Sequence, residues 1–192
     1  TLFSVGCSYL FHHYPEVAIP ITPFEYSGAV LSLFLVLRIN SGLDRWWEAR
    51  KIWGGIVNSS RNLAIIVKSY TQGDNEQVQS LLKWIAVWPH VMRQSLRDEK
   101  ELNEVIHLLG EKETLLIRQS QHMPTYVGTQ IAVRLSELRK KGLDDFAFQR
   151  AERERGLLID AIGASERIRN TPIPLSLAII IRRFVLSFLL LL

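Results

Sequence analysis

The sequence predicts an all-α protein in which membrane helices flank a cytosolic helical region. No segment shows the strict alternation of apolar and polar residues that is typical of a β-strand. Apolar residues dominate both ends, residues 1–14 and 177–192, whereas charged residues fill the part between them. There the apolar residues recur with the 3.6-residue period of an amphipathic helix. Lysine and arginine are frequent in this part, and the positive-inside rule places such segments on the cytoplasmic side.

The composition divides the 192 residues between two environments. A mean hydropathy of +0.08 is high for a soluble domain with 22% charged residues and low for a protein that lies wholly in a membrane. The net charge of +4 favours acidic partners such as anions, anionic lipid or nucleic acid. The single cysteine, Cys7, excludes an internal disulfide and a cysteine-based metal site, and fits a reducing compartment.

The first two segments are expected to be an apolar helix and a long helix that changes character along its length. Residues 1–14 read as the end of a first transmembrane helix, and three prolines between residues 15 and 23 then enforce a turn. Residues 22–67 are predicted as one helix that is apolar at first and charged later. We expect the first helix to begin before residue 1, and the last helix of the chain to continue beyond residue 192.

The region 68–170 is predicted to be a cytosolic set of amphipathic helices. One helix covers residues 77–96, a short one residues 97–109, and another begins after Pro124 and ends at Gly142 as its C-cap. The prolines of "NTPIPLS" end the region, and residues 171–192 lead into a second apolar helix. The residues predicted to face the core are Val78, Leu81, Leu82, Ile85, Ala86 and Trp88 in the first helix, Ile131, Leu135 and Leu138 in the third, and Phe146, Leu157, Leu158 and Ile162 after it.

Enzymatic and nucleic-acid-binding functions have little support in the sequence. His12 and His13 are adjacent and cannot share a helix face as metal ligands, and no phosphate-binding or nucleophile motif is present. Arg45 and Glu48 are three residues apart, so we expect them to pair with each other. Acidic residues interrupt the basic ones, and a nucleic-acid interface would leave the apolar ends unexplained. We therefore expect neither an enzyme nor a nucleic-acid partner.

A stripe of small and large apolar residues marks one face of the long helix. Ala29, Leu33 and Leu37 follow one another at intervals of four residues and so share that face. The stripe is consistent with ordinary core or lipid-facing surface. On periodicity alone that reading is favoured, and the alternative is that several copies of the helix surround an axis and form apolar rings, which gate by dewetting. Arg38 and Asn40 then mark the start of a wetter mouth.

The stretch "NSGLDRWWEARKIWG" (residues 40–54) resembles the signature of the bestrophin family, in particular its bacterial and plant-like branch. "TPFEYSGAVLSLFLVLR" is similar to the pore-lining second helix of the family, and "MPTYVGTQIAVRLSELRKKG" to its Met-Pro helix. "SERIRNTPIPLSLAIIIRRF" is similar to the segment that returns to the membrane. The resemblance extends in order over nearly the whole chain.

This resemblance implies a homopentameric ion channel with its pore on the fivefold axis. By position, the membrane neck of the pore consists of Ala29, Leu33 and Leu37, and the cytosolic aperture of Ile173. The family usually has large apolar side chains in all three neck rings. Ala29 departs from that pattern, so the neck is expected to be shorter here.

The resemblance also gives a role to the charged stretch after the neck, here called the belt. Arg45, Glu48 and Arg50 are expected to form ion pairs within and between subunits. The three tryptophans supply packing area or interfacial anchoring, and plain core filling is the alternative for each of them. The complete belt comprises Arg38, Asn40, Arg45, Trp46, Trp47, Glu48, Arg50 and Trp53.

The expected function is passive conduction of small monovalent ions, with anions such as chloride favoured by the basic charge. The alternatives are a cation-conducting channel of the same fold and a non-conducting, membrane-tethered helical scaffold protein. The expected partners are further copies of the chain, the lipid bilayer and permeant ions. The expected location is a bacterial inner membrane crossed several times. No cofactor is expected, and the calcium clasp of animal members lies in a region that follows the last membrane helices, so calcium dependence stays open.

Overall fold

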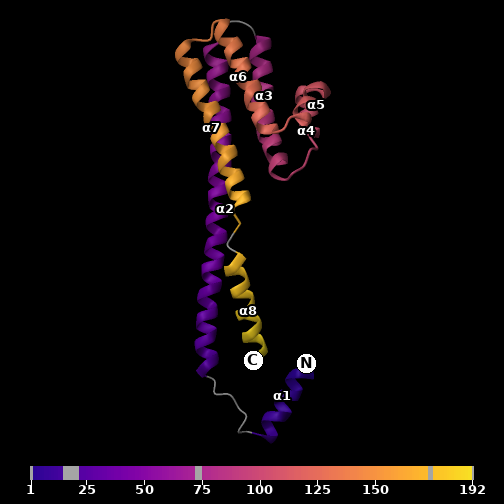
Figure 1. Ribbon diagram of the computed structural model, residues 1–192. Helices are drawn as coiled ribbons and strands as arrows, with labels where there is room; N and C mark the ends of the chain where they lie inside the picture. The colour runs from indigo at the N-terminus through magenta and orange to yellow at the C-terminus, as the bar shows by residue number, and fades with distance from the viewer. Residues whose placement is uncertain (1, 15–21, 72–74, 173–174, 192) are drawn as a thin grey trace. The chain divides into compact units, whose positions relative to one another are not determined.

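The computed structural model describes residues 2–14, 22–71, 75–172 and 175–191, and within these ranges the regular structure is helical (Figure 1). The one exception there is an isolated antiparallel bridge between Thr71 and Leu143. The prediction of an all-α protein is confirmed. The helices are α1 (Leu2–His13), α2 (Thr22–Tyr70), α3 (Asn75–Leu96), α4 (Asn103–Leu109), α5 (Glu111–Gln119), α6 (Met123–Lys140), α7 (Asp145–Asn170) and α8 (Leu175–Leu191).

The chain divides into two compact units, and α2 contributes to both. The first unit comprises Thr1–Leu43 with Ile173–Leu192, and the second comprises Asp44–Pro172. The first unit therefore contains the apolar helices, and the second contains the amphipathic ones.

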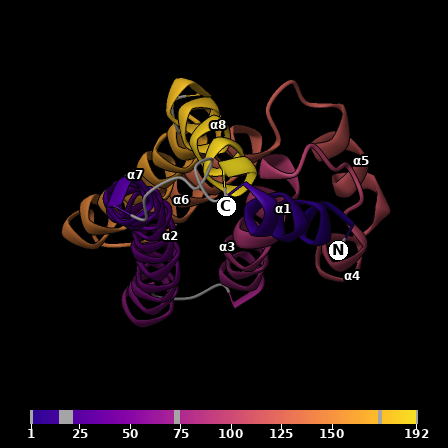
Figure 2. The same ribbon diagram turned by 90° about the horizontal axis from the view of Figure 1, so that it is seen from below.

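The second unit is a bundle in which α3, α6 and α7 pack against one another. The part of α2 from Asp44 onward runs along α7, as a hydrogen bond from Asn62 to Glu154 shows. The short helices α4 and α5 lie on the side of the bundle away from α7, which Figure 1 and the perpendicular view in Figure 2 both show. Helix α4 packs against α3, and α5 against α6.

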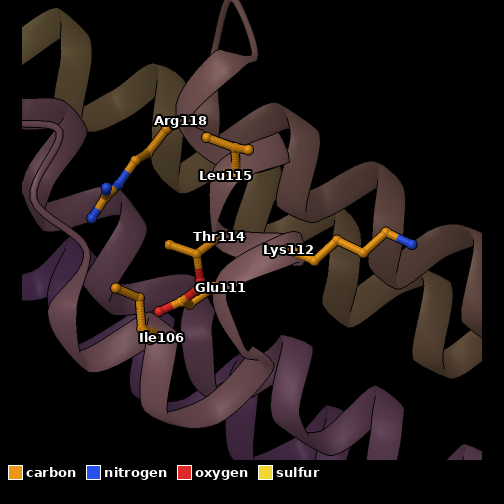
Figure 3. A pocket seen from close by; sticks show the side chains of 6 residues that line it. All are labelled: Ile106, Glu111, Lys112, Thr114, Leu115 and Arg118. Carbon is orange, nitrogen blue, oxygen red and sulfur yellow. The ribbon is translucent and has the colours of Figure 1, made fainter.

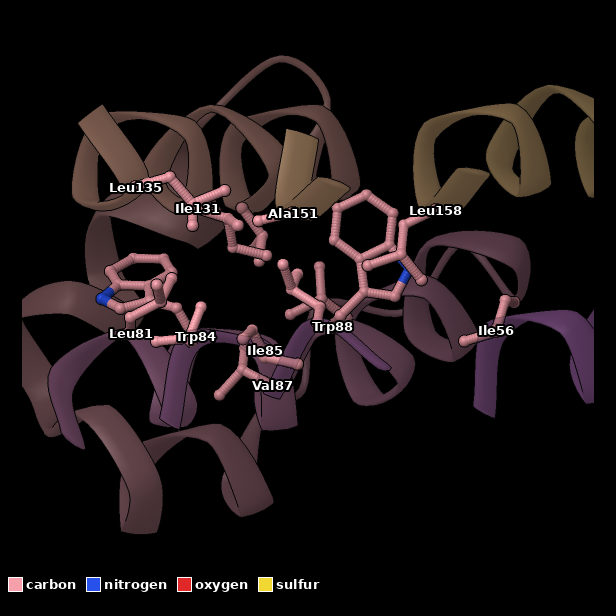
Figure 4. Packing of buried hydrophobic residues seen from close by; sticks show 14 of the residues in the cluster. Ile56, Leu81, Trp84, Ile85, Val87, Trp88, Ile131, Leu135, Ala151 and Leu158 are labelled. Atoms are coloured by element: carbon pink, nitrogen blue, oxygen red, sulfur yellow. The ribbon is translucent and has the colours of Figure 1, made fainter. Parts of the chain in front are cut away.

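The core of this bundle is apolar and closely packed (Figure 4). The indoles of Trp84 and Trp88 on α3 are 1% and 0% exposed, and Leu158 of α7 is also fully buried. Removing each such side chain from water contributes about 1.5–3 kcal/mol to folding. The other large side chains that are fully buried are Ile56, Leu63, Leu81, Met92, Leu102, Ile117, Ile131, Leu135 and Leu138.

Local signals in the sequence explain the ends of α6 and α7. The backbone N–H of Thr125 donates to Nδ1 of the N-cap residue His122, and a proline occupies the first turn of α6. Asp144 accepts hydrogen bonds from the backbone of Phe146 and Ala147 at the start of α7. Gly142 follows the C-cap of α6 with a φ of +115°, so the predicted glycine lies one residue beyond the cap itself.

Most of the predicted core faces are confirmed, with three corrections. The predicted faces of α3 and α6 are buried or partly buried, except that Ala86 is exposed. On α7, Leu158 and Ile162 are buried, whereas Phe146 is 78% and Leu157 46% exposed. The buried positions of α7 are Ala147, Ala151, Leu158, Ile162 and Ser165, a stripe that passes beside Phe146 and Leu157.

The short helix expected over residues 97–109 begins only at Asn103. Asp98 adopts a φ of +58°, which a helix does not accommodate, and its side chain pairs with Arg169 of α7. The turn after α3 therefore extends to Leu102, which is fully buried.

In the first unit, α8 packs along the N-terminal part of α2 in the antiparallel direction. The rings of Phe34 and Phe184 meet edge to face at a centroid distance of 6.1 Å. A Cβ atom added at Gly28 would lie 3.8 Å from the ring of Phe188, which is ordinary van der Waals contact, so Phe188 of α8 lies beside this position of α2. Ile181 of α8 is 2% exposed.

Candidate functional site

The predicted neck residues lie on a face of α2 that is free in the single chain. Ala29 is exposed, and the side chains of Leu33 and Leu37 are 60% and 49% exposed. The face of α2 toward α8 is a different one, because it carries Gly28, Phe34 and the partly buried residues between them. An exposed apolar stripe of this kind needs lipid or other protein to cover it.

Helix α2 is long and apolar enough from Phe24 onward to cross a membrane. Among the described residues it is the one helix that meets this test, and none of its apolar window is buried inside the chain. A core helix of a soluble protein would be buried instead.

Two belt residues bind α7 rather than each other. Arg45 donates hydrogen bonds to the backbone carbonyl oxygens of Ile168 and Thr171. The predicted pairing of Arg45 with Glu48 is therefore wrong. The last carbonyls of a helix have no partner within it and carry the negative end of its dipole, so a guanidinium is a favourable ligand for them.

Glu48 forms an ion pair with Arg167 of α7, one of the contacts expected of the belt within a subunit. Sequence analysis missed Arg167 as the partner. The available signal was its place in the last turn of α7, where basic residues favour the helix dipole.

The remaining belt residues are mostly at the surface. Arg38, Asn40 and Arg50 are exposed, and within the described ranges the Arg50 side chain has no hydrogen bond or ion pair. Trp46 and Trp47 are 61% and 56% exposed, with ring centroids 6.0 Å apart. Trp53 packs against the core of the second unit.

Core filling therefore describes Trp53 but not the two exposed tryptophans. Ile173, the predicted cytosolic aperture, lies outside the described residues.

Two charged groups of the second unit have displaced pKa values. The pKa of Glu104 is lowered, chiefly because Nη2 of Arg93 donates a hydrogen bond to its Oε2 at 2.8 Å. His90 lowers this pKa further. Burial lowers the pKa of Arg134, whose guanidinium lies 4.5 Å from the centre of the Trp84 ring. Both arginines fasten neighbouring helices or turns, which is a structural role.

A pocket of about 540 Å³ lies at α4 and α5 (Figure 3). Its walls combine the apolar Ile106 and Leu115 with the charged Glu111 and Arg118, and Lys112 points away from the others. In the ranges that the structure covers, no group of three or more His, Cys, Asp or Glu side chains could hold a metal ion.

A helix of membrane-spanning length with an antiparallel apolar partner, joined in sequence to a polar helical bundle, is the arrangement expected of a helical membrane protein. The particular family follows from comparison with known sequences. The chain belongs to the bestrophin family, because the family model described as bacterial/fungal bestrophin protein matches residues 1–192. The resemblance found in the sequence is confirmed.

The chain is similar to curated bacterial proteins named voltage-dependent anion channel-forming proteins. It is 30% identical over 192 residues to one from Nostoc sp.. The aligned region covers 97% of this chain and 62% of that protein. It is 34% identical over 168 residues to one from Mesorhizobium japonicum. That alignment covers 85% of this chain and 52% of the relative. The chain thus spans less than two thirds of the length of these relatives.

Solved structures show the same fold. The chain is similar to the crystal structure of a bacterial bestrophin homolog from Klebsiella pneumoniae, with a TM-score of 0.86 and 21% sequence identity. The similarity covers 95% of this chain and 68% of that one.

Proposed function

We propose that this chain is part of a bestrophin-type ion channel, a homopentamer that conducts small anions passively across a bacterial inner membrane. The observation that carries the proposal is the exposed stripe of Leu33 and Leu37 on a helix of membrane-spanning length. The names of the Nostoc and Mesorhizobium relatives support it, since both are called anion channel-forming proteins.

In this proposal the neck works by hydrophobic gating. Five copies of Leu33 and Leu37 would form two apolar rings in which water and ions are unstable, so a small widening or narrowing changes conduction steeply. Ala29 adds a wider third ring, and Arg38 and Asn40 begin the hydrated mouth on the cytosolic side. Ile173 is the proposed exit constriction. The proposal involves no chemical step and no cofactor.

An apolar ring carries no charge with which to select an ion, so the choice of anions rests on the net charge of +4 and on the relatives. A cation channel of the same fold is the second candidate. A membrane-tethered scaffold without a pore is the third.

The test of function is a recording from the chain reconstituted in a planar bilayer with asymmetric NaCl. An anion channel gives a reversal potential near the Nernst potential of chloride. A reversal potential near the Nernst potential of sodium would contradict anion selectivity, but the protein would still be an ion channel. Inserted protein without current would overturn the channel in favour of the scaffold.

The test of assembly is the protein mass in detergent, measured by light scattering after subtraction of the bound detergent. A pentamer has five times the chain mass of 22.1 kDa. A monomer or dimer would contradict a fivefold pore, because the rings of Leu33 and Leu37 would have no partners.

A further inference from the structure

A polar pocket of about 250 Å³ lies between α3 and α6, within the second unit. A site for a drug-sized ligand occupies about 300–1,000 Å³, so this pocket suits a smaller molecule. Its walls are formed by two residues of α3, Gln77 and Ser80, and four of α6, Gln130, Val133, Arg134 and Glu137.

The guanidinium of Arg134 is partly buried and incompletely paired. Nε donates a hydrogen bond to Oγ of Ser80, and Nη1 donates to the backbone and side-chain oxygens of Gln130. Among the described residues, these bonds leave Nη2 without an acceptor. Burial lowers the pKa of this arginine, because the charged form loses solvation. A negative group that entered the pocket would restore part of the lost solvation.

Glu137 brings a negative charge to the same pocket without pairing with Arg134. It follows Arg134 by three residues and so lies on the same face of α6. The carboxylates of Glu113 and Glu137 oppose the effect of burial on the pKa of Arg134, and they do so through charge, without a hydrogen bond. The pocket therefore presents a cation and an anion that are close together but not in contact.

This pair of charges disfavours simple ions. A small anion beside Arg134 is repelled by Glu137, and a small cation beside Glu137 is repelled by Arg134. A zwitterion avoids both repulsions. The ammonium and carboxylate groups of an α-amino acid are attached to one carbon, and residues three apart on a helix have Cβ atoms about 5–6 Å apart. One small amino acid is therefore long enough to bind both side chains.

Two further wall residues fit the same ligand. Oε1 of Gln77 is buried and has no hydrogen-bond donor among the described residues, which is costly for a polar atom. A small rotation of the Gln77 side chain would let this oxygen accept a hydrogen bond from the ammonium group. Val133 is 46% exposed and offers an apolar contact to a short side chain.

We propose that this pocket binds a small zwitterionic α-amino acid, with its carboxylate on Arg134 and its ammonium group on Glu137. The site goes beyond the proposed function, because passive conduction requires no ligand in the bundle. Arg134 also joins α3 to α6, so the amino acid would bind where these helices meet.

The experiment is isothermal titration calorimetry of the full chain in detergent with L-alanine, propionate and ethylamine. Propionate lacks the ammonium group of L-alanine, and ethylamine lacks its carboxylate. L-alanine is expected to bind about tenfold more tightly than either, since each of them loses one charge-assisted pair and meets one repulsion.

Three variants locate the site. Arg134→Gln is expected to abolish the binding of L-alanine. Glu137→Gln changes an exposed side chain and should leave the fold intact, but L-alanine then loses its advantage over propionate. Asp160→Asn removes an exposed carboxylate of α7 that does not line this pocket, and it should keep that advantage.

Three results would overturn the proposal. Wild-type protein that binds propionate as tightly as L-alanine would assign the pocket to simple anions. The absence of saturable heat with millimolar L-alanine would leave the pocket to water. An unchanged advantage of L-alanine over propionate in Glu137→Gln would place the binding elsewhere. Each of these measurements is made without ion flow, so none depends on the proposed channel.

Discussion

Arg45 of α2 donates a hydrogen bond from Nη2 to the backbone carbonyl oxygen of Ile168, 123 residues further along the chain, and so joins α2 to the last turn of α7. A second bond, to the carbonyl oxygen of Thr171, fastens the C-cap residue of the same helix. One side chain thus satisfies two carbonyls that have no partner within α7.

Replacing Arg45 by glutamine is expected to destabilise the second unit by about 1–2 kcal/mol. Hydrogen bonds to a charged group are worth about 1.5–3 kcal/mol each, and partial solvent exposure reduces this value here. For a chain of this length the thermal midpoint should fall by about 3–6 °C, measured by circular dichroism in detergent. Arg50→Gln, which changes an exposed neighbour on the same helix, is the control and should leave the midpoint unchanged.

Replacing Leu33 and Leu37 together by alanine is expected to raise single-channel conductance. Smaller side chains widen the proposed apolar rings and lower the barrier to hydration. The control is Leu35→Ala, which makes the same truncation at one residue on the opposite side of α2 from the stripe. The neck assignment would be wrong if conductance rose as much in the control as in the double variant, or if it rose in neither.

The sequence predicted the features that depend on local periodicity. Residues 22–67 were expected to form one helix, and α2 covers Thr22–Tyr70. Ile131, Leu135 and Leu138 were expected on one buried face of α6, and they are buried. Such faces follow from spacing alone, because residues three or four apart lie together on a helix.

The features that depend on long-range placement could not be predicted in this way. Glu48 is within local reach of Arg45, yet its partner is Arg167, 119 residues away. The choice follows from where α7 ends against α2, which no local pattern encodes. Phe146 was expected in the core as the start of the apolar stripe of α7, and it is exposed because the buried stripe begins at Ala147.

The neck residues stay predictions for a related reason. A ring around an axis exists only in the assembly, and a single chain shows no more than the exposed stripe of Leu33 and Leu37.

Replacing Gly128 by alanine is expected to destabilise the bundle by about 1–3 kcal/mol, the usual cost of overpacking a core. A Cβ atom there would lie 2.7 Å from Cδ1 of Ile159 and 3.1 Å from the Trp88 ring. Ile159 can rotate away, but the buried indole cannot. Gly156→Ala, on α7, meets nothing within 4 Å and should instead stabilise by about 0.5–1 kcal/mol. Urea unfolding of both variants tests the difference in sign.

The ion pairs of Glu104 with Arg93 and His90 should make the attachment of α4 to α3 sensitive to acid. The pKa of Glu104 is lowered in the folded protein, chiefly by the hydrogen bond from Arg93, so its ionised form stabilises the fold. That contribution is fully present above the ordinary glutamate pKa of 4.5 and is lost as the pH falls through the lowered value. Glu104→Gln should therefore be less stable than the wild type at pH 7.

The gap between the two proteins should close as the pH is lowered below 4.5, because the wild-type carboxylate then becomes protonated as well. Urea unfolding at a series of pH values measures this gap, with Glu99→Gln as the control, since Glu99 is an exposed carboxylate in the segment between α3 and α4. A gap that stays constant into acid would show that Glu104 acts through packing and not through its charge.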